Sequence, residues 1–190
     1  MKRLLQIIIV ACSVAHVEAS WWDRVRDAVM EKTELTLASP DLIQGKVIPQ
    51  KFTCIGKNIA PALVWRGVPL RTKSFIVLVE DRDIKNRPDA FVHWLVFNIP
   101  AMTMTLEQGG TALPKEAVQG KNSFGTIGYR GPCSPSGQIH YCHFSLYALD
   151  TMLDLPEGAT KQQVMDAAGG HIIASDTFTR TSMMGDPIID

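Results

Sequence analysis

Two cysteines and two histidines lie close together in the stretch GPCSPSGQIHYCHF, which runs from Gly131 to Phe144. Thiolates and imidazoles are common zinc ligands, and two nearby cysteines can form a redox pair. A loop rich in Gly and Pro at the end of a strand can also form the wall of a ligand pocket. The residue types therefore allow three kinds of site, namely a metal site, a redox pair and a ligand pocket.

Strand geometry narrows these alternatives. Side chains alternate along a regular strand, which places His140 and Cys142 on one face, together with Phe144 and Leu146, and His143 on the other. Because His140 and His143 then point apart, they cannot bind one metal ion. The chain has no C-x-x-C motif, so a thioredoxin-type redox pair is unsupported. A zinc site built from His93, His140 and Cys142 stays open as an alternative, although we expect neither a metal nor a cofactor.

Further polar residues interrupt apolar segments that are expected to be buried. His93 lies inside the run FVHWLVF, and Asp81 and Asp83 follow another apolar run. A buried polar group must find a partner, because leaving it unsatisfied costs free energy. One outcome is a structural His–Asp pair in the core, and the other is a small pocket that presents imidazole donors to an anion. The combination of His93 and His140 with the aspartates and a Gly-Pro loop favours the pocket.

The elements that must position these residues are mostly strands. Residues 73–80, 92–99 and 139–150 are rich in β-branched and aromatic side chains and are bounded by Pro, Gly, Asp and Asn. Their nearly continuous apolar character predicts a sheet that is covered on both faces. A helix is predicted within residues 155–178, with Thr160 as its N-cap, Gln163 completing a capping box, and the Gly169-Gly170 pair interrupting the run.

Length and composition exclude several classes of protein. The chain has 190 residues, of which 46% are hydrophobic, so it can bury one substantial core. Its 19 basic and 19 acidic side chains cancel without forming a basic stripe, so we expect no nucleic-acid partner. Beyond the N-terminal segment of residues 1–19, the sequence contains no run of apolar residues long enough to cross a membrane. The motifs G-x-S-x-G, S-x-x-K, H-E-x-x-H and G-x-x-x-x-G-K-[ST] are absent.

The N-terminus has the pattern of an export signal. Lys2 and Arg3 precede an apolar run, and VEA ends the segment, so residues 1–19 are predicted to be a signal peptide that is cleaved before Ser20. The alternative is a lipobox, IVAC, that would anchor the protein through Cys12. Residues 20–34 then form an N-terminal amphipathic segment, and residues 35–190 form the main domain. Secretion or a periplasmic location would permit disulfides.

The mature chain would keep three cysteines, namely Cys54, Cys133 and Cys142. An odd number indicates one disulfide and one remaining thiol.

Several ordered motifs resemble those of the phosphatidylethanolamine-binding protein family, also called Raf kinase inhibitor-like proteins. The motifs are DRD, VHWLVFNIP, GYRGPCSPSGQIHY and LYALD, and the resemblance runs from about Leu35 to Ala174, nearest to the bacterial and archaeal branch. It implies a mainly β fold with a large central antiparallel sheet, a smaller second sheet and peripheral helices. It also implies a small pocket for phosphate-like anions.

The resemblance assigns roles to individual residues. The implied ligand-binding residues are Asp81, Asp83, His93, Gly131, Pro132, His140 and Cys142, and the implied disulfide joins Cys54 to Cys133. Two positions depart from the family pattern. Arg82 replaces a proline and could place a cation near the mouth of the pocket. Cys142 replaces a tyrosine with a softer and weaker hydrogen-bonding group.

The sequence therefore predicts an exported binding protein that holds a small phosphorylated or anionic ligand, such as phosphate or a phospholipid headgroup, without turnover. The resemblance also leaves open an interaction protein that inhibits a partner kinase or protease. A hydrolase or metalloenzyme is the third alternative.

Overall fold

The computed structural model describes residues 34–82, 89–134 and 138–183. The predictions for the signal segment, the lipobox and the N-terminal amphipathic segment lie outside these residues, as does Asp83. Within the described part, no helix is long and apolar enough to cross a membrane.

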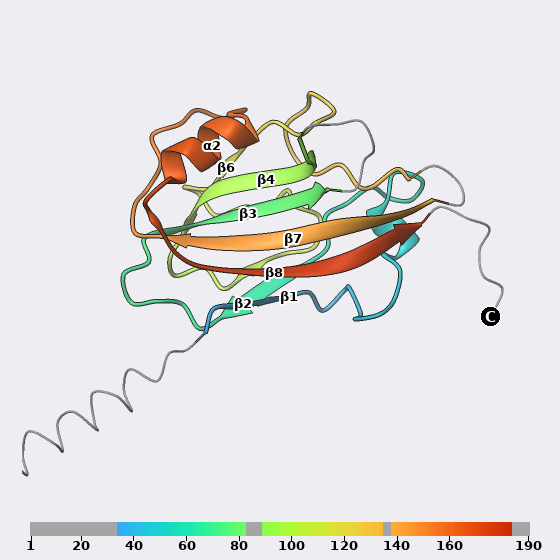
Figure 1. The fold of residues 1–190 in the computed structure, drawn as a ribbon, viewed down its shortest axis with the longest axis horizontal. Helices are drawn as coiled ribbons and strands as arrows, with labels where there is room; N and C mark the ends of the chain where they lie inside the picture. The colour runs from blue at the N-terminus through green and yellow to red at the C-terminus, as the bar shows by residue number, and fades with distance from the viewer. Residues whose placement is uncertain (1–33, 83–88, 135–137, 184–190) are drawn as a thin grey trace, which may run out of the picture. The chain divides into compact units, whose positions relative to one another are not determined.

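A five-stranded antiparallel sheet forms the centre of the fold (Figure 1). Its strand order is β6-β4-β3-β7-β8, with β3 at Ser74–Asp81, β4 at Phe91–Pro100, β6 at Val118–Gln119, β7 at Ile139–Leu149 and β8 at Ile172–Met183. Every residue of β3 is buried, as its β-branched and apolar sequence predicts. The end of β3 and the starts of β4 and β7 lie at the same end of the sheet, because the pairings are antiparallel.

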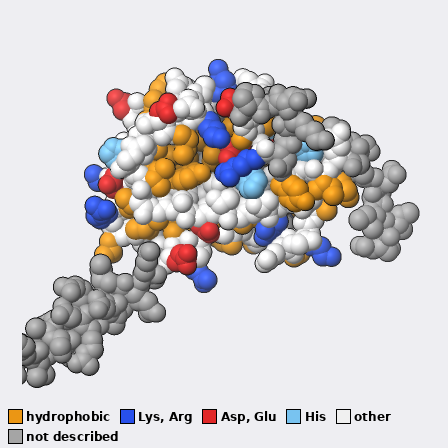
Figure 2. Space-filling model, viewed as in Figure 1, with side chains coloured by type: hydrophobic (Ala, Val, Ile, Leu, Met, Phe, Trp, Pro, Cys, Tyr) orange, Lys and Arg blue, Asp and Glu red, His pale blue; other side chains and the backbone are white. Residues whose placement is uncertain are grey.

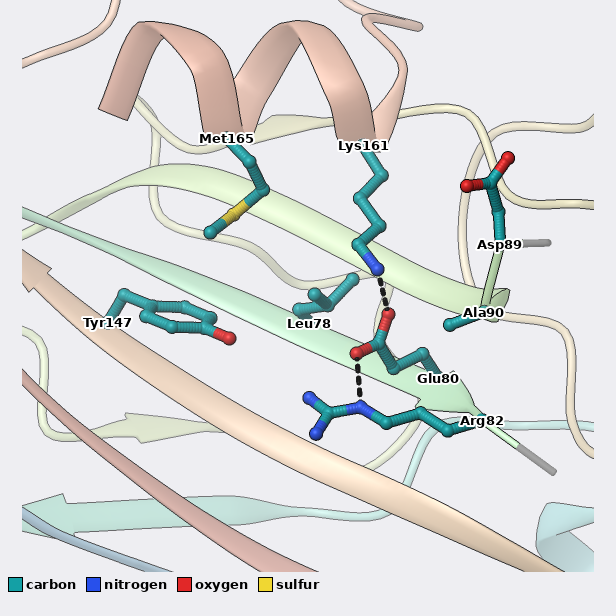
Figure 3. Close-up of a pocket in the computed structure, with 8 residues that line it drawn as sticks. All are labelled: Leu78, Glu80, Arg82, Asp89, Ala90, Tyr147, Lys161 and Met165. Carbon is teal, nitrogen blue, oxygen red and sulfur yellow. Dashed lines mark hydrogen bonds and ion pairs between the residues drawn. The ribbon is translucent and has the colours of Figure 1, made fainter. Parts of the chain in front are cut away.

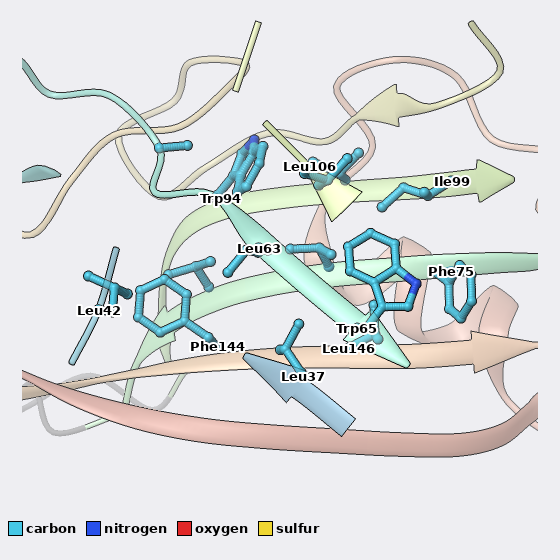
Figure 4. Close-up of a cluster of buried hydrophobic side chains, with 14 of the residues drawn as sticks. Leu37, Leu42, Leu63, Trp65, Phe75, Trp94, Ile99, Leu106, Phe144 and Leu146 are labelled. Atoms are coloured by element: carbon cyan, nitrogen blue, oxygen red, sulfur yellow. The ribbon is translucent and has the colours of Figure 1, made fainter. Parts of the chain in front are cut away.

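A smaller antiparallel sheet covers one face of the large sheet. Its order is β1-β2-β5, with β1 at Thr36–Ala38, β2 at Leu63–Arg66 and β5 at Thr105–Leu106. The 3-10 helix η1, Gln50–Phe52, lies beyond β1 along the chain. The main hydrophobic core fills the space between the two sheets (Figure 4). It contains Phe75, Val77 and Val79 from β3, and Phe144 and Leu146 from β7.

The other face of the large sheet packs against the helix α2, Lys161–Ala168 (Figure 1). Ile76 and Leu78 of β3 alternate with the core residues named above, so they point to this second face, where Val164 and Ala168 of α2 cover them. The predicted capping box is present, since the Thr160 side chain accepts from the backbone N–H of Gln163 and the Gln163 side chain accepts from that of Thr160. The predicted combination of a large and a small antiparallel sheet is confirmed.

One element was not predicted from the sequence. The helix ends at Ala168, and the residues that follow Gly169-Gly170 form β8, an edge strand that pairs with β7 along its length. The helical interpretation of residues 155–178 is therefore wrong beyond Ala168. Gly170 has a φ of 79°, which ends the helix and turns the chain back toward the sheet.

Candidate functional site

The site begins with two residues on the core side of the large sheet. Asp81 is the last residue of β3 and is 3% exposed, and it pairs in register with Cys142 of β7. His140 lies two residues earlier on β7, on the same face, and its Nδ1 is 2.5 Å from Oδ2 of Asp81. The face predicted for His140, Cys142, Phe144 and Leu146 is confirmed, because the last three lie in the core between the sheets.

His93 joins this pair because of a β-bulge. Val79 pairs with Trp94 and Glu80 pairs with Val92, so His93 is an extra residue on β4 with no partner on β3. A bulge turns the extra side chain out of regular alternation. His93 is buried, and it interacts electrostatically with Asp81 and His140. The structure therefore brings together one carboxylate and two imidazoles from three adjacent strands.

Burial lowers the pKa of His93, although a backbone hydrogen bond to Arg130 and the charge of Asp81 act in the opposite direction. A nearby carboxylate by itself raises the pKa of an imidazole, but for His93 the loss of hydration is the larger effect. Nδ1 of His93 lies 2.8 Å from the carbonyl oxygen of Arg130, so this nitrogen carries the proton and donates it. Nε2 of the neutral ring is therefore a hydrogen-bond acceptor.

Two aromatic rings form a wall beside His93. The Phe91 and His93 ring centroids lie 5.3 Å apart, and Phe91 contacts Phe124 edge-on at 4.8 Å. The Arg130 guanidinium lies over the Phe124 ring at 4.3 Å, which places a permanent cation near the imidazoles. Sequence reasoning did not identify Phe91, Phe124 or Arg130. Arg130 directly precedes the predicted Gly-Pro loop, and Phe91 lies two residues before His93, so both were within the motifs already singled out.

The Gly-Pro loop packs tightly against the segment that follows η1. A Cβ on Gly131 would lie 2.1 Å from the carbonyl oxygen of Phe52, so only glycine fits there. The Gly131 N–H donates to Oδ1 of Asn58 at 2.8 Å, and the Cys54 N–H donates to the carbonyl oxygen of Pro132 at 3.1 Å.

The predicted disulfide between Cys54 and Cys133 is present. It joins residues that are 79 positions apart and fixes the Gly-Pro loop to the segment after η1. The same loop carries the Arg130 carbonyl that orients His93. The disulfide therefore supports the wall of the site and not only the stability of the chain.

The remaining predicted residues have separate positions. Cys142 is fully buried in the core cluster, next to Asp81 in register, and it is the cysteine of the described residues that lies outside the disulfide. Arg82 does not lie near the imidazoles, because its Nε binds Glu80, whose side chain points to the α2 face. His143 is on the face opposite His140, where its Nδ1 lies 3.0 Å from the Thr179 hydroxyl. Among the described residues, no three His, Cys, Asp or Glu side chains are grouped so that they could hold a metal ion.

The two imidazoles can present one hydrogen-bond donor and one acceptor. A protonated imidazole at His140 would donate from Nε2, because Nδ1 is engaged by Asp81. The neutral His93 accepts at Nε2. A donor beside an acceptor matches an oxyanion that still carries a proton.

Comparisons with known proteins agree with the motifs. Residues 38–182 match the family model described as phosphatidylethanolamine-binding protein. A UPF0098 protein of Methanothermobacter thermautotrophicus is 46% identical over 129 residues, which cover 66% of this chain and 83% of that protein.

Two solved structures have the same fold with substantial sequence identity. The homolog CT736 of Chlamydia trachomatis aligns with a TM-score of 0.74 and 37% identity, covering 80% of this chain and 99% of that one. YbcL of E. coli, described as a member of the mammalian PEBP family, aligns with a TM-score of 0.75 and 32% identity over the same shares. Since the family model matches well over half of the chain and includes each of the site motifs, this chain belongs to the phosphatidylethanolamine-binding protein family.

Proposed function

We propose that this protein binds a small phosphate-type anion at Asp81, His93 and His140 and does not turn it over. The observation that supports this most directly is the contact of Asp81 with Nδ1 of His140 at 2.5 Å. It fixes the ring so that the second nitrogen faces away from the carboxylate, and no other described residue engages that nitrogen. A ring held in this way is oriented before the ligand arrives.

The proposed ligand is a protonated oxyanion, such as hydrogen phosphate or a phosphate ester that retains a proton. His93 accepts the ligand's P–O–H proton, and His140, when protonated, donates to a second oxygen. Sulfate has the same shape but no proton to give to His93 near neutral pH, so it leaves that acceptor unsatisfied. Phosphate should therefore bind more tightly than sulfate.

Calorimetric titration with inorganic phosphate and with sulfate tests this function. His140→Ala should weaken phosphate binding about tenfold to a hundredfold, because a charge-assisted hydrogen bond contributes about 1.5–3 kcal/mol. His143→Ala is the matched control, since it removes an imidazole from the same strand on the opposite face, and phosphate affinity should not change. Affinity in the wild type should fall between about pH 6 and about pH 8, where imidazoles lose their proton.

Loss of binding in His143→Ala but not in His140→Ala would contradict the proposal. Equal affinity for phosphate and sulfate would contradict the role of His93.

Export is part of the same proposal. The N-terminal pattern predicts cleavage before Ser20, and the Cys54–Cys133 disulfide supports an oxidising compartment. N-terminal sequencing of the exported protein should begin at Ser20. A start at Cys12 with added lipid mass would instead indicate a lipid-anchored protein.

One observation favours a second candidate function, binding to a partner kinase or protease. Ile139 and Met183 pair across β7 and β8, Tyr141 follows on the same face, and all three apolar side chains are exposed. In this alternative, the double variant Ile139→Ser with Tyr141→Ser would lose a partner that His140→Ala still captures. If the partner is instead captured by the Ile139→Ser and Tyr141→Ser double variant but not by His140→Ala, only the anion-binding function remains.

A further inference from the structure

A second pocket lies on the α2 face of the large sheet, opposite the imidazoles (Figure 3). Its volume is about 400 Å³, which is within the range of small-molecule sites. Leu78 and Glu80 of β3 and Tyr147 of β7 line it, together with Lys161 and Met165 of α2. Figure 2 shows Lys and Arg side chains beside an apolar area between the helix and the sheet.

A buried carboxylate organises this pocket. Glu80 is 2% exposed and accepts from Nζ of Lys161 at 2.5 Å and from Nε of Arg82 at 2.8 Å. Both cations reach the surface, with side-chain exposures of 34% for Lys161 and 48% for Arg82. The carboxylate therefore fixes the positions of two cationic groups that border open space.

Each cation keeps donors that Glu80 does not use. Arg82 has five N–H donors in a planar fork, and Glu80 takes only the one on Nε. The two terminal nitrogens have no partner among the described residues, and in Figure 3 they lie on the side of Tyr147, whose hydroxyl points into the same space. Lys161 likewise has spare donors on Nζ. Around Glu80 the unused polar groups are therefore mainly donors, and Asp89 adds a carboxylate elsewhere in the lining.

The charge and the lining together select a class of ligand. Four charged side chains line the pocket, namely Arg82 and Lys161 with Glu80 and Asp89, so the lining as a whole carries no net charge. Glu80 is held between the two cations, and the Asp89 carboxylate points away from them in Figure 3, so the space beside the Arg82 fork is locally cationic. A small local excess of positive charge matches a singly charged ligand better than a dianion. Leu78 and Met165 provide an apolar surface beside the donors, and a guanidinium fork matches a planar carboxylate.

We propose that this pocket binds a small monocarboxylate with a short apolar or aromatic body. The carboxylate would lie against the Arg82 fork, within reach of Lys161 and Tyr147, and the apolar body would lie against Leu78 and Met165. This site is separate from the anion site, because Glu80 and Asp81 are consecutive residues that point to opposite faces of β3. The inference does not depend on the proposed phosphate-type function.

The test is a titration of the whole protein with benzoate and with hexanoate, monitored by the NMR signals of the Met165 methyl group and the Tyr147 ring. Both probes should shift these signals in a saturable way. Benzamide and hexanamide have the same bodies without the charge and should shift them much less. Arg82→Gln should weaken benzoate binding about tenfold, since it removes the charge-assisted bonds of the fork. Arg66→Gln, which changes an arginine on the small sheet, should leave benzoate binding unchanged.

Arg82→Lys is a second variant that retains a cation for Glu80 but removes the fork, and it should also weaken benzoate binding if Arg82→Gln does not fold. The proposal is overturned if benzamide binds as well as benzoate, if neither Arg82 variant weakens binding, or if benzoate shifts Phe91 and His140 instead. Phosphate titration of Arg82→Gln keeps the two sites distinguishable. If Arg82→Gln loses benzoate binding but keeps its phosphate affinity, the two pockets are separate. If neither the wild type nor any variant binds phosphate, the proposed phosphate-type function is contradicted, but the carboxylate pocket is not.

Discussion

Glu80 and Asp81 are neighbours at the end of β3, but they serve opposite faces of the sheet and have different partners. Asp81 contacts His140 on the face covered by the small sheet, and Glu80 contacts Lys161 and Arg82 on the face covered by α2. Both carboxylates are almost fully buried, at 3% and 2% exposure. Because side chains alternate along a strand, two adjacent residues contribute to two polar sites on opposite faces of the sheet.

The partners make the two faces chemically different. An imidazole gains or loses its proton near neutral pH, whereas lysine and arginine keep their charge there. The anion site, with His93 and His140, can therefore change its donors with pH, whereas the two cations of the α2-face pocket, Lys161 and Arg82, keep their charge. His143 lies on the α2 face and pairs with Glu80, but it does not line that pocket. We therefore expect benzoate binding to change with pH much less than phosphate binding.

The walls of the two sites also differ. The Gly-Pro loop borders the imidazoles and is fixed by the Cys54–Cys133 disulfide, whereas Lys161 and Met165 belong to a helix with its own capping box. The first wall depends on a covalent bond between distant segments, and the second depends on local hydrogen bonds. A change in the Gly-Pro loop should therefore affect the anion site more than the α2-face pocket, and a change in α2 should do the opposite.

Removing the disulfide should have the largest effect. The double variant Cys54→Ser with Cys133→Ser opens a loop of 79 residues, and the chain-entropy model gives a loss of about 4–5 kcal/mol in the free energy of unfolding. Urea denaturation measures this change. Cys142→Ala is the control, because it removes a buried sulfur atom but keeps the disulfide, and it should cost clearly less. Phosphate affinity should fall more than benzoate affinity, and an equal loss of both would show that the two walls are not independent.

Removing both cations from the α2 face should have the next largest effect. Lys161→Met with Arg82→Met leaves the buried Glu80 carboxylate without the two partners described above, and an uncompensated buried charge costs about 3–5 kcal/mol. Adding Glu80→Gln to the double variant should restore much of this loss, because the buried charge is then gone. Thermal and urea denaturation of the two variants provide the comparison. A triple variant that is less stable than the double variant would mean that Glu80 contributes through packing and not through its charge.

The sequence was sufficient to predict that His140 and Asp81 meet. Alternation along residues 139–150 correctly placed His140 on the core face, and its position relative to Asp81 follows from two strands that pair at the same end of the sheet. The position of His93 could not be predicted in this way. Regular alternation from the core residue Trp94 would point His93 to the α2 face, and a single extra residue in β4 leaves no clear pattern in the sequence.

The second site depends on contacts that sequence patterns do not reveal. Lys161 lies 81 positions from Glu80, and a lysine at the start of a helix reads as an ordinary surface residue. The edge strand β8 was missed for a related reason. It alternates between exposed and half-buried residues and carries many polar side chains, so its apolar signal is weak directly after a helix.

The smallest predicted effect is a pH dependence that originates from His93. Burial lowers the pKa of His93 in the folded protein, while in the unfolded chain a histidine titrates near about 6.5. The unfolded state therefore binds more protons as the pH falls, and the free energy of unfolding decreases as the pH is lowered through and below about 6.5. One group can contribute at most about 1.4 kcal/mol per pH unit.

Urea denaturation of the wild type and of His93→Gln between about pH 7.5 and about pH 5 measures this contribution. Glutamine can still donate to the Arg130 carbonyl oxygen but does not titrate, so the variant should lose less stability than the wild type as the pH falls. Asp81 and His140 also face His93 and are unchanged in the variant, so the difference between the two curves reports the His93 ring together with its electrostatic interaction with these two groups. Parallel curves would mean that the ring is not held neutral. The donor–acceptor pair that distinguishes phosphate from sulfate would then be lost, and with it the main chemical difference between the two faces of the sheet.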